Sequence, residues 1–284
     1  MQTLPFESAT GCVLESHALV EVPLAEIRGL RDAPVPDGAP ALPPRFLRHC
    51  DEHTVVGVRA VLEAIAALPD PTRPFDRYGV VGAPRIAGRI TGAQTLVQAA
   101  AAGGIAVSPH VVPQCSLHAL ASAVSVALGM HGLNLGAGGG PEALSEGLYT
   151  AISLVNASAC AGLWLVLTEW DEEPVLDAVG RPTGDPLCRA VALALRPPAA
   201  PDASTVAFTI RNADPIAACD QSSGTTGHGL ADLARAVAAC AGGGGITSWS
   251  HICPWGAEIR IVAPAAAARP ARSEDRGPAR REAA

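Results

Sequence analysis

The sequence predicts an α/β protein, in which helices and strands alternate along the chain. Segments with apolar residues at helical spacing are followed by short apolar runs bounded by glycine and proline, the alternation typical of α/β layers. The 284 residues, 49% of them hydrophobic, are enough to bury one large core or two small ones. We expect no membrane-spanning helix, because no apolar segment reaches ~18 residues without turn-forming residues.

Charge and residue usage exclude several functions. The net charge of −7 argues against nucleic acid as the main partner. All 20 basic residues are arginine, which excludes Schiff-base chemistry and a lysine general base. The eight cysteines form no CxxC pair, and the first residues have neither a basic start nor an apolar run. We therefore expect a cytoplasmic protein with reduced thiols.

The first predicted elements follow a proline-rich connection at residues 33–44. Apolar residues at helical spacing predict a helix over 52–68, which Pro69 ends. Residues 78–82 are typical of a buried strand. An alanine-rich helix is expected over 91–102, with Thr91 as its N-cap.

A second group of predicted elements surrounds a glycine-rich bend. Residues 115–130 are nearly all apolar and predict a helix in the interior. Residues 132–140 read as a short strand and a bend that lead into a helix over 141–154. Pro141 suits the first position of that helix, and Glu142 suits the positive end of its dipole.

The glycines of the bend do not form a dinucleotide-binding fingerprint. Such a fingerprint needs a glycine where Pro141 stands and an acidic residue at the end of the next strand. The glycines instead indicate a tight bend where backbones approach closely. We expect no phosphate-binding site here and no cofactor.

The second half of the chain predicts more strands than helices. Strands are expected at 163–168, 188–195, 205–210 and 258–262, with one helix at 227–240. Residues 265–284 consist mainly of Ala, Arg and Pro and are expected to be disordered. The sequence therefore predicts a single domain over residues 1–264.

Five strings, in this order, resemble segments of the β-ketoacyl synthase family. They are the helix start Gln114–Ala123 with its Ser-Leu-His-Ala at 116–119, the turn Met130–Asn134, the acidic turn Thr168–Pro174, the Gly-His loop Ser222–Gly229 and the loop and strand Cys253–Val262. The chain is most similar to the short synthase-like proteins of aryl polyene and polyketide clusters, often called chain-length factors. The resemblance implies a thiolase-like layered fold with a mixed sheet and a truncated second half, because a complete synthase is considerably longer.

The chain departs from the family at its catalytic positions. In the family, the nucleophilic cysteine lies at such a glycine-rich bend, where the helix N-terminus lowers its pKa. Counting from Gly132 places this position on Pro141, and counting back from Gly147 places it on Leu144. Neither side chain is a nucleophile. The His-Gly-Thr-Gly-Thr string and the lysine of the Gly-His loop are also missing.

His228 alone aligns with a catalytic histidine of the family, although a histidine at a helix start that bonds to backbone is the commoner case. Cys115 and His118 could form a thiol–imidazole pair on one helical face, but a structural role for His118 is favoured. Ser145, one turn into its helix, could act as a displaced nucleophile, yet no base can be assigned to it from the sequence.

Two further groups of side chains contain residue types that can bind metal ions. His251 and Cys253 flank one residue, and two ligands are fewer than the three or four that a zinc site needs. The acidic residues 169–173 are expected to form a solvated turn rather than a cation site. We expect no metal.

The resemblance implies a non-catalytic subunit that pairs with a ketosynthase in polyketide, aryl polyene or fatty acid biosynthesis, with an acyl carrier protein as a further partner. It implies a homodimer or heterodimer formed through the strand at about 133–138. The expected pocket or interface residues are Cys115, His118, Leu133, Gly138, Gly139, Gly140 and Ser145.

Two alternatives stay open. One is a small acyltransferase or decarboxylase that acts on acyl thioesters through His228, and the other is a homodimeric scaffold without catalysis.

Overall fold

The chain folds into stacked layers of helices and strands. The computed structural model describes residues 10–157, 160–198, 205–213, 225–226, 229–242 and 248–264. The helices are α1 (Leu24–Leu30), α2 (Glu52–Ala66), α3 (Arg89–Ala102), the 3₁₀ helix η1 (Gly104–Ala106), α4 (Val111–Gln114), α5 (Ala119–Ala127), α6 (Ala143–Ala157) and α7 (Leu230–Gly242). The strands are β1 (Thr10–Pro23), β2 (Tyr78–Pro84), β3 (Asn134–Gly136), β4 (Gly162–Trp170), β5 (Val175–Leu176), β6 (Pro182–Thr183), β7 (Leu187–Arg196), β8 (Ala207–Asn212), β9 (Thr225–Thr226), β10 (Ser248–Ile252) and β11 (Ala257–Val262).

Most strands of the described chain belong to one mixed sheet. Its order is β3-β2-β4-β7-β1-β8-β11-β10-β9, and β5 pairs separately with β6. β2 is parallel to both β3 and β4, whereas β4, β7, β1, β8 and β11 pair in antiparallel fashion. The mixed sheet that the resemblance implies is therefore confirmed.

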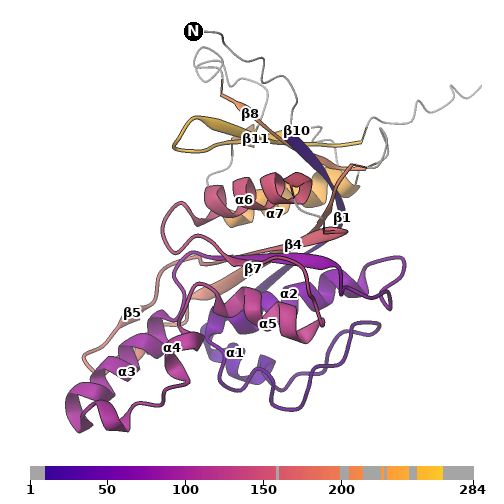
Figure 1. Ribbon diagram of the computed structural model, residues 1–284. Helices are drawn as coiled ribbons and strands as arrows, with labels where there is room; N and C mark the ends of the chain where they lie inside the picture. The colour runs from indigo at the N-terminus through magenta and orange to yellow at the C-terminus, as the bar shows by residue number, and fades with distance from the viewer. Residues whose placement is uncertain are drawn as a thin grey trace, which may run out of the picture.

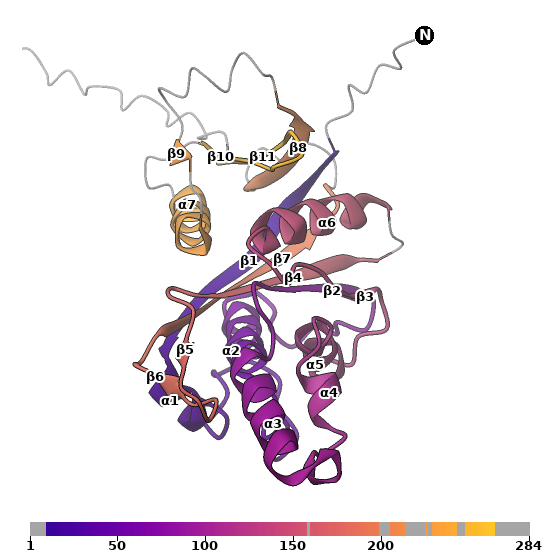
Figure 2. The ribbon, with the colours of Figure 1, turned by 90° about the vertical axis from the view of Figure 1, so that its left-hand side faces the viewer.

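The long strand β1 joins the two parts of this sheet. It pairs with β7 along most of its length and with β8 at its first four residues, and its register shifts between Leu14 and Ser16. A bulge of this kind bends a strand and increases its twist. The part with β8, β10 and β11 consequently lies across α6 and α7 from the part with β2, β4 and β7 (Figures 1 and 2).

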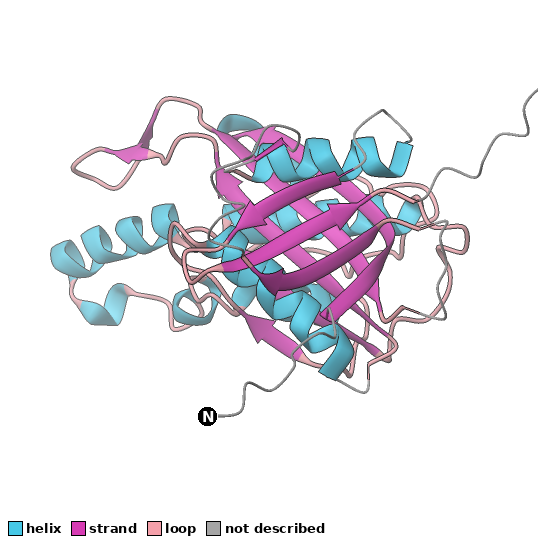
Figure 3. Cartoon of the chain, turned by 90° about the horizontal axis from the view of Figure 1, so that it is seen from above, coloured by secondary structure: helices cyan, strands magenta, loops and turns pink. Residues whose placement is uncertain are grey.

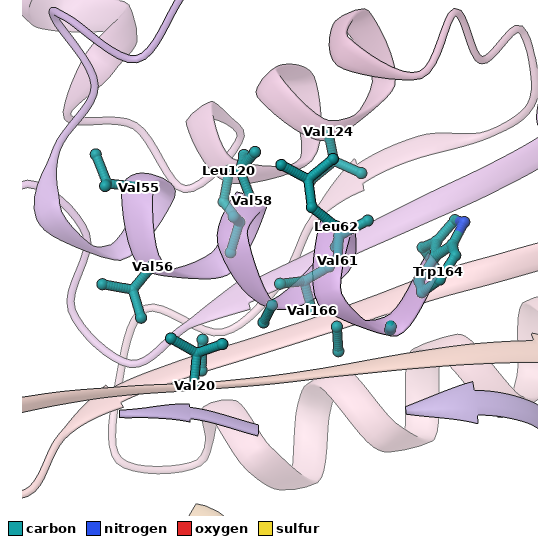
Figure 4. Close-up of a cluster of buried hydrophobic side chains, with 14 of the residues drawn as sticks. Val20, Val55, Val56, Val58, Val61, Leu62, Leu120, Val124, Trp164 and Val166 are labelled. Atoms are coloured by element: carbon teal, nitrogen blue, oxygen red, sulfur yellow. The ribbon is translucent and has the colours of Figure 1, made fainter. Parts of the chain in front are cut away.

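The core has two halves, one on each face of the β2-β4-β7 part. On one face, α2 and α5 pack against the sheet through side chains such as Val58, Leu62, Leu120 and Trp164 (Figure 4). On the other face, α6 and α7 fill the space between the two parts of the sheet. Burial of each Val or Leu side chain contributes about 1.5–3 kcal/mol to the stability of the fold. The packing of helices on the two faces of the sheet therefore holds the layers together.

The outer face of the β8-β10-β11 part is polar. Along β11, Ile259 and Ile261 are buried against the middle helices, whereas Glu258 and Arg260 face outward. The carboxylate of Glu258 pairs with Arg211 at 2.7 Å and with Arg260 at 3.4 Å. This face has little apolar surface to bury, and no described helix covers it (Figure 1).

Most of the predicted elements are confirmed within a few residues. They are α2, β2, α3, the helix α6, β4, β7, β8, α7 and β11. No described helix is both long and apolar enough to cross a bilayer. The expected disordered segment 265–284 lies outside the described residues.

Three local predictions are wrong. The cap of α3 is Gly88, whose φ of 62° is in the left-handed region, and not Thr91. The helix expected over 115–130 is shorter, since α5 starts only after His118 and ends at Ala127. α5 is also not interior on all sides, because Val126 is 68% exposed. Seen from above, α3 and the β5–β6 hairpin extend beyond the sheet (Figure 3).

Candidate functional site

The glycine-rich bend connects the edge strand β3 to α6. The amide of Ala137 donates to Gly82 O at 2.9 Å, and the amide of Gly139 donates to Pro84 O at 2.9 Å, so the bend follows the end of β2. Gly138 and Gly139 have φ of 82° and 91°. A Cβ on Gly139 would lie 2.7 Å from Leu117 Cδ2. The bend is therefore tight and closely packed, as its glycines indicate.

Pro141 and Leu144, the two positions that the resemblance assigns to the nucleophile, lie at the start of α6. Pro141 is exposed and precedes the helix, and Leu144 is half-buried in its first turn. Both line a cavity of about 90 Å³, together with Arg85, Glu169 and Leu230 among others. Ligand pockets usually measure ~300–1,000 Å³. The cavity that the described residues form is therefore too small for an acyl thioester.

Glu169 ties this cavity to α7. Its Oε1 accepts the amide of Leu230 at 3.1 Å and lies 3.5 Å from Nη1 of Arg189, and its Oε2 lies 4.0 Å from Nη1 of Arg85. A carboxylate at the first turn of a helix also faces the positive end of its dipole. The prediction of a solvated acidic turn is thus wrong for Glu169, which positions the start of α7.

Ser145 and His251 form a buried hydrogen bond that the sequence did not predict. Ser145 Oγ lies 2.8 Å from His251 Nε2, and the two residues are 2% and 7% exposed. The imidazole stacks in parallel on Trp249, with ring centroids 5.8 Å apart. From the sequence, no base could be assigned to Ser145. In the structure its neighbour His251 belongs to β10, which lies on the far side of α6 from the β2-β4-β7 part.

Cys253 lies beside this pair but holds an inert thiol. Burial raises its pKa to about 11, although a hydrogen bond with Ser145 acts in the opposite direction. A thiol with this pKa is protonated at neutral pH, and the thiolate is the nucleophilic form. His251 and Cys253 do not gather further ligands: no group of three or more potential metal ligands exists among the described residues.

A serine next to a histidine is the basic unit of nucleophilic catalysis, but it needs access for a substrate. Both side chains are buried, and neither lines the 90 Å³ cavity at the start of α6. In this state the pair acts as a structural tie between α6 and β10.

The other candidates are spread over the molecule. Cys115 and His118 lie at the two ends of the short segment between α4 and α5, and the structure records no hydrogen bond between them. Cys115 packs against Gly88, where a Cβ would lie 2.5 Å from Cys115 Cβ. His118 is exposed rather than interior. His228 lies outside the described residues.

A second buried polar cluster lies on the opposite face of the sheet. Asp51 caps α2 by accepting the amide of Thr54 at 2.9 Å, and its other oxygen accepts the amide of Gly88 at 2.8 Å. His53 Nδ1 lies 2.9 Å from Thr168 Oγ1. This cluster fixes the end of β4 and the start of α2, and sequence reasoning missed it because its members are far apart in the chain.

Comparison with known proteins agrees with this fold. No family model and no curated protein matches the sequence. Among solved structures, a chain of the ketosynthase (ApeO) in complex with its chain length factor (ApeC) from Xenorhabdus doucetiae is 15% identical, with a TM-score of 0.52 over 88% of this chain and 99% of that chain. A chain of AntDE:AntF, a type II PKS acyl-carrier protein in complex with its ketosynthase bound to the hexaketide, is 12% identical, with a TM-score of 0.59 over 89% and 99%.

The fold is thiolase-like. The ishigamide ketosynthase/chain length factor gives the same result, with 15% identity and a TM-score of 0.51 over 89% of this chain and 99% of that chain. The chain therefore extends over nearly the whole length of these neighbours, and the expectation of a truncated second half is wrong relative to them. Because the sequence identities are this low, the similarity to these structures shows the fold alone.

Proposed function

We propose that this chain is a non-catalytic, chain-length-factor-like subunit that pairs with a ketosynthase. The observation that carries the proposal is the start of α6. Neither Pro141 nor Leu144, the positions that the resemblance assigns to the nucleophile, has a nucleophilic side chain, and the cavity that both line measures only about 90 Å³. The fold neighbours include complexes of a ketosynthase with its chain length factor.

The proposed pairing surface is the free edge of β3. This strand ends the sheet and pairs only with β2 among the described strands. Leu133 and Leu135 are 36% and 37% exposed there, and Leu117 contacts the adjacent bend. An exposed apolar strand edge is a template for pairing with another chain. Extension of the sheet across a two-fold axis would cover it.

We further propose that the partner's acyl chain ends against residues 132–147, which would limit its length by steric volume. The close packing of the bend supports this role, because a rigid wall limits length better than a mobile one. Polyketide, aryl polyene and fatty acid assembly are the pathways proposed, with an acyl carrier protein as the source of the acyl group. Such a carrier is present in the AntDE:AntF complex.

The test is co-expression with the ketosynthase encoded beside this chain, followed by size-exclusion chromatography with light scattering. The proposal expects a heterodimer in which Leu135→Asp abolishes pairing. Leu96→Asp, which changes an exposed leucine on α3, is the matched control and should leave the complex intact. Absence of a complex, together with unchanged product length on deletion, would reject this function. A stable homodimer that ignores the ketosynthase would favour the scaffold alternative.

An acyltransferase or decarboxylase is the second candidate. The Ser145–His251 hydrogen bond is the observation in its favour, and His228 is the residue that the resemblance assigns to it. This candidate function is supported if the protein turns over acyl thioesters and both Ser145→Ala and His228→Ala abolish the turnover. Unaltered turnover in both variants would dismiss it.

A further inference from the structure

Two neighbouring cavities lie between α1, the loop 31–51 and the start of α2. These helices are on the face of the sheet opposite α6 (Figure 1). The first measures about 640 Å³ and the second about 500 Å³. Both volumes fall in the range of ~300–1,000 Å³ that is typical of ligand pockets. The cavities share Arg31, Asp32 and Arg45, so they are adjacent compartments of one site.

The compartments differ in chemistry. The larger one is lined by Arg28, Arg31, Arg45 and Arg48 and by the carboxylates of Asp32 and Glu52. Four guanidinium groups against two carboxylates leave an excess of positive charge, in a chain whose net charge is −7. The smaller compartment is lined largely by apolar side chains of the same loop and its flanking helices, among them Leu30, Val35, Leu42 and Phe46.

Three of the four arginines are available to a ligand. Arg31 is part of the wall, since its Nη1 donates to Leu47 O at 2.8 Å and to Cys50 O, and its Nη2 lies 3.9 Å from Glu52 Oε1. The side chains of Arg28, Arg45 and Arg48 are exposed and have no hydrogen-bond or ion-pair partner among the described residues.

Arg45 has an unusual backbone. Its φ is 61°, and no other non-glycine residue in the described part of the chain has a positive φ. Two turns hold this backbone in place: Phe46 N donates to Pro43 O and Arg48 N donates to Arg45 O, both at 3.0 Å. A glycine would adopt this conformation without strain. An arginine at such a position is explained by a use for its side chain.

We propose that the two compartments bind an amphipathic anion, with its aliphatic chain in the apolar compartment and its carboxylate or phosphate head on Arg28, Arg45 and Arg48. The planar guanidinium group, with its fork of donors, matches both head groups. No residue of 132–147 lines either compartment, so the site is distinct from the surface proposed for pairing.

Isothermal titration calorimetry tests the ligand class. Decanoate and decyl phosphate are titrated below their critical micelle concentrations. Acetate and inorganic phosphate, which represent the head groups alone, and decanol, which represents the aliphatic chain without a charge, are titrated as controls. We expect at least one of the two anions to bind saturably, at least 10-fold more tightly than acetate, inorganic phosphate or decanol. Comparison of decanoate with decyl phosphate identifies the preferred head group. Failure of both anions to saturate, or equal binding of decanol, would overturn the proposal.

Arg45→Gly separates binding from folding, because it removes the guanidinium group and relieves the backbone strain together. We expect it to weaken binding of the better anion at least 10-fold while the thermal midpoint stays at or above that of the wild type. Arg48→Ala should also weaken binding. Arg77→Ala removes the same charge from an exposed arginine that lines neither cavity and should bind as the wild type does. Wild-type affinity in Arg45→Gly, or an equal loss in Arg77→Ala, contradicts the site.

Discussion

Ser145 on α6 and His251 on β10 are hydrogen-bonded across the interior at 2.8 Å, although 106 positions separate them in the chain. Ser145 directly follows Leu144, one of the two positions that the resemblance assigns to the nucleophile. The side chains of Ser145 and His251 are withdrawn from solvent, and the neighbouring Cys253 thiol has a pKa of about 11 because it is buried. This arrangement holds α6 against β10.

Ser145→Ala should destabilise the fold by about 1–3 kcal/mol, because it leaves the imidazole nitrogen buried without its partner. His251→Ala should cost more, since it also removes the ring that stacks on Trp249. Urea unfolding of the two single variants and the double variant gives the coupling energy, expected at about 0.5–3 kcal/mol. A coupling near zero would mean that the hydrogen bond contributes nothing to stability.

Gly139→Ala should destabilise the protein by about 1–3 kcal/mol, since its backbone is left-handed and its Cβ would meet the side chain of Leu117. Gly140→Ala is the matched control in the same bend, because nothing lies within 4 Å of its Cβ position. It should change the free energy of unfolding by less than about 0.5 kcal/mol. Equal losses in thermal unfolding experiments would show that the bend is not constrained as described.

The sequence was sufficient for the elements with clear periodicity or an uninterrupted apolar run. α2 shows apolar residues at helical spacing and β4 is an apolar run, and both were predicted within two residues. β1 was missed because its shift of register between Leu14 and Ser16 interrupts the alternation of buried and exposed residues. The late start of α5 was missed because composition alone does not show where a helix begins.

The site could be predicted only in part. The glycine-rich bend is a local feature, and it is visible in the sequence. The partners of Ser145 and Glu169 are not, since His251 and Leu230 come from other elements that only the folded sheet brings near. A polar side chain that is buried by distant elements has no local signal.

Asp51→Ala should cost about 2–3 kcal/mol, more than the ~1 kcal/mol of an ordinary N-cap, because two buried amides would lose their acceptor. These are the amides of Thr54 and Gly88. Asp51→Asn keeps the Oδ1 acceptor and should recover part of the loss. Asp37→Ala, which changes an exposed aspartate, serves as the control in chemical denaturation and should be nearly neutral. A loss in Asp51→Ala no larger than in Asp37→Ala would contradict the double role.

His53 should make the fold less stable in mild acid. Burial lowers the pKa of this imidazole below its ordinary value of 6.5, although Asp51 and a hydrogen bond with the backbone of Ile86 act in the opposite direction. Below that value the unfolded chain binds a proton that the folded chain does not, so the free energy of unfolding falls as the pH decreases, by up to about 1.4 kcal/mol per pH unit.

His17, whose pKa burial also lowers, adds a slope of the same sign. Urea unfolding between about pH 5 and 7.5 measures the combined slope. His53→Asn retains a donor near Thr168 but cannot titrate, and it should flatten the profile, whereas His49→Asn, an exposed histidine, should leave the profile unchanged. If His53→Asn keeps the full slope of the wild type, the proton is bound elsewhere, and the cluster of Asp51, His53 and Thr168 is not what limits stability in acid.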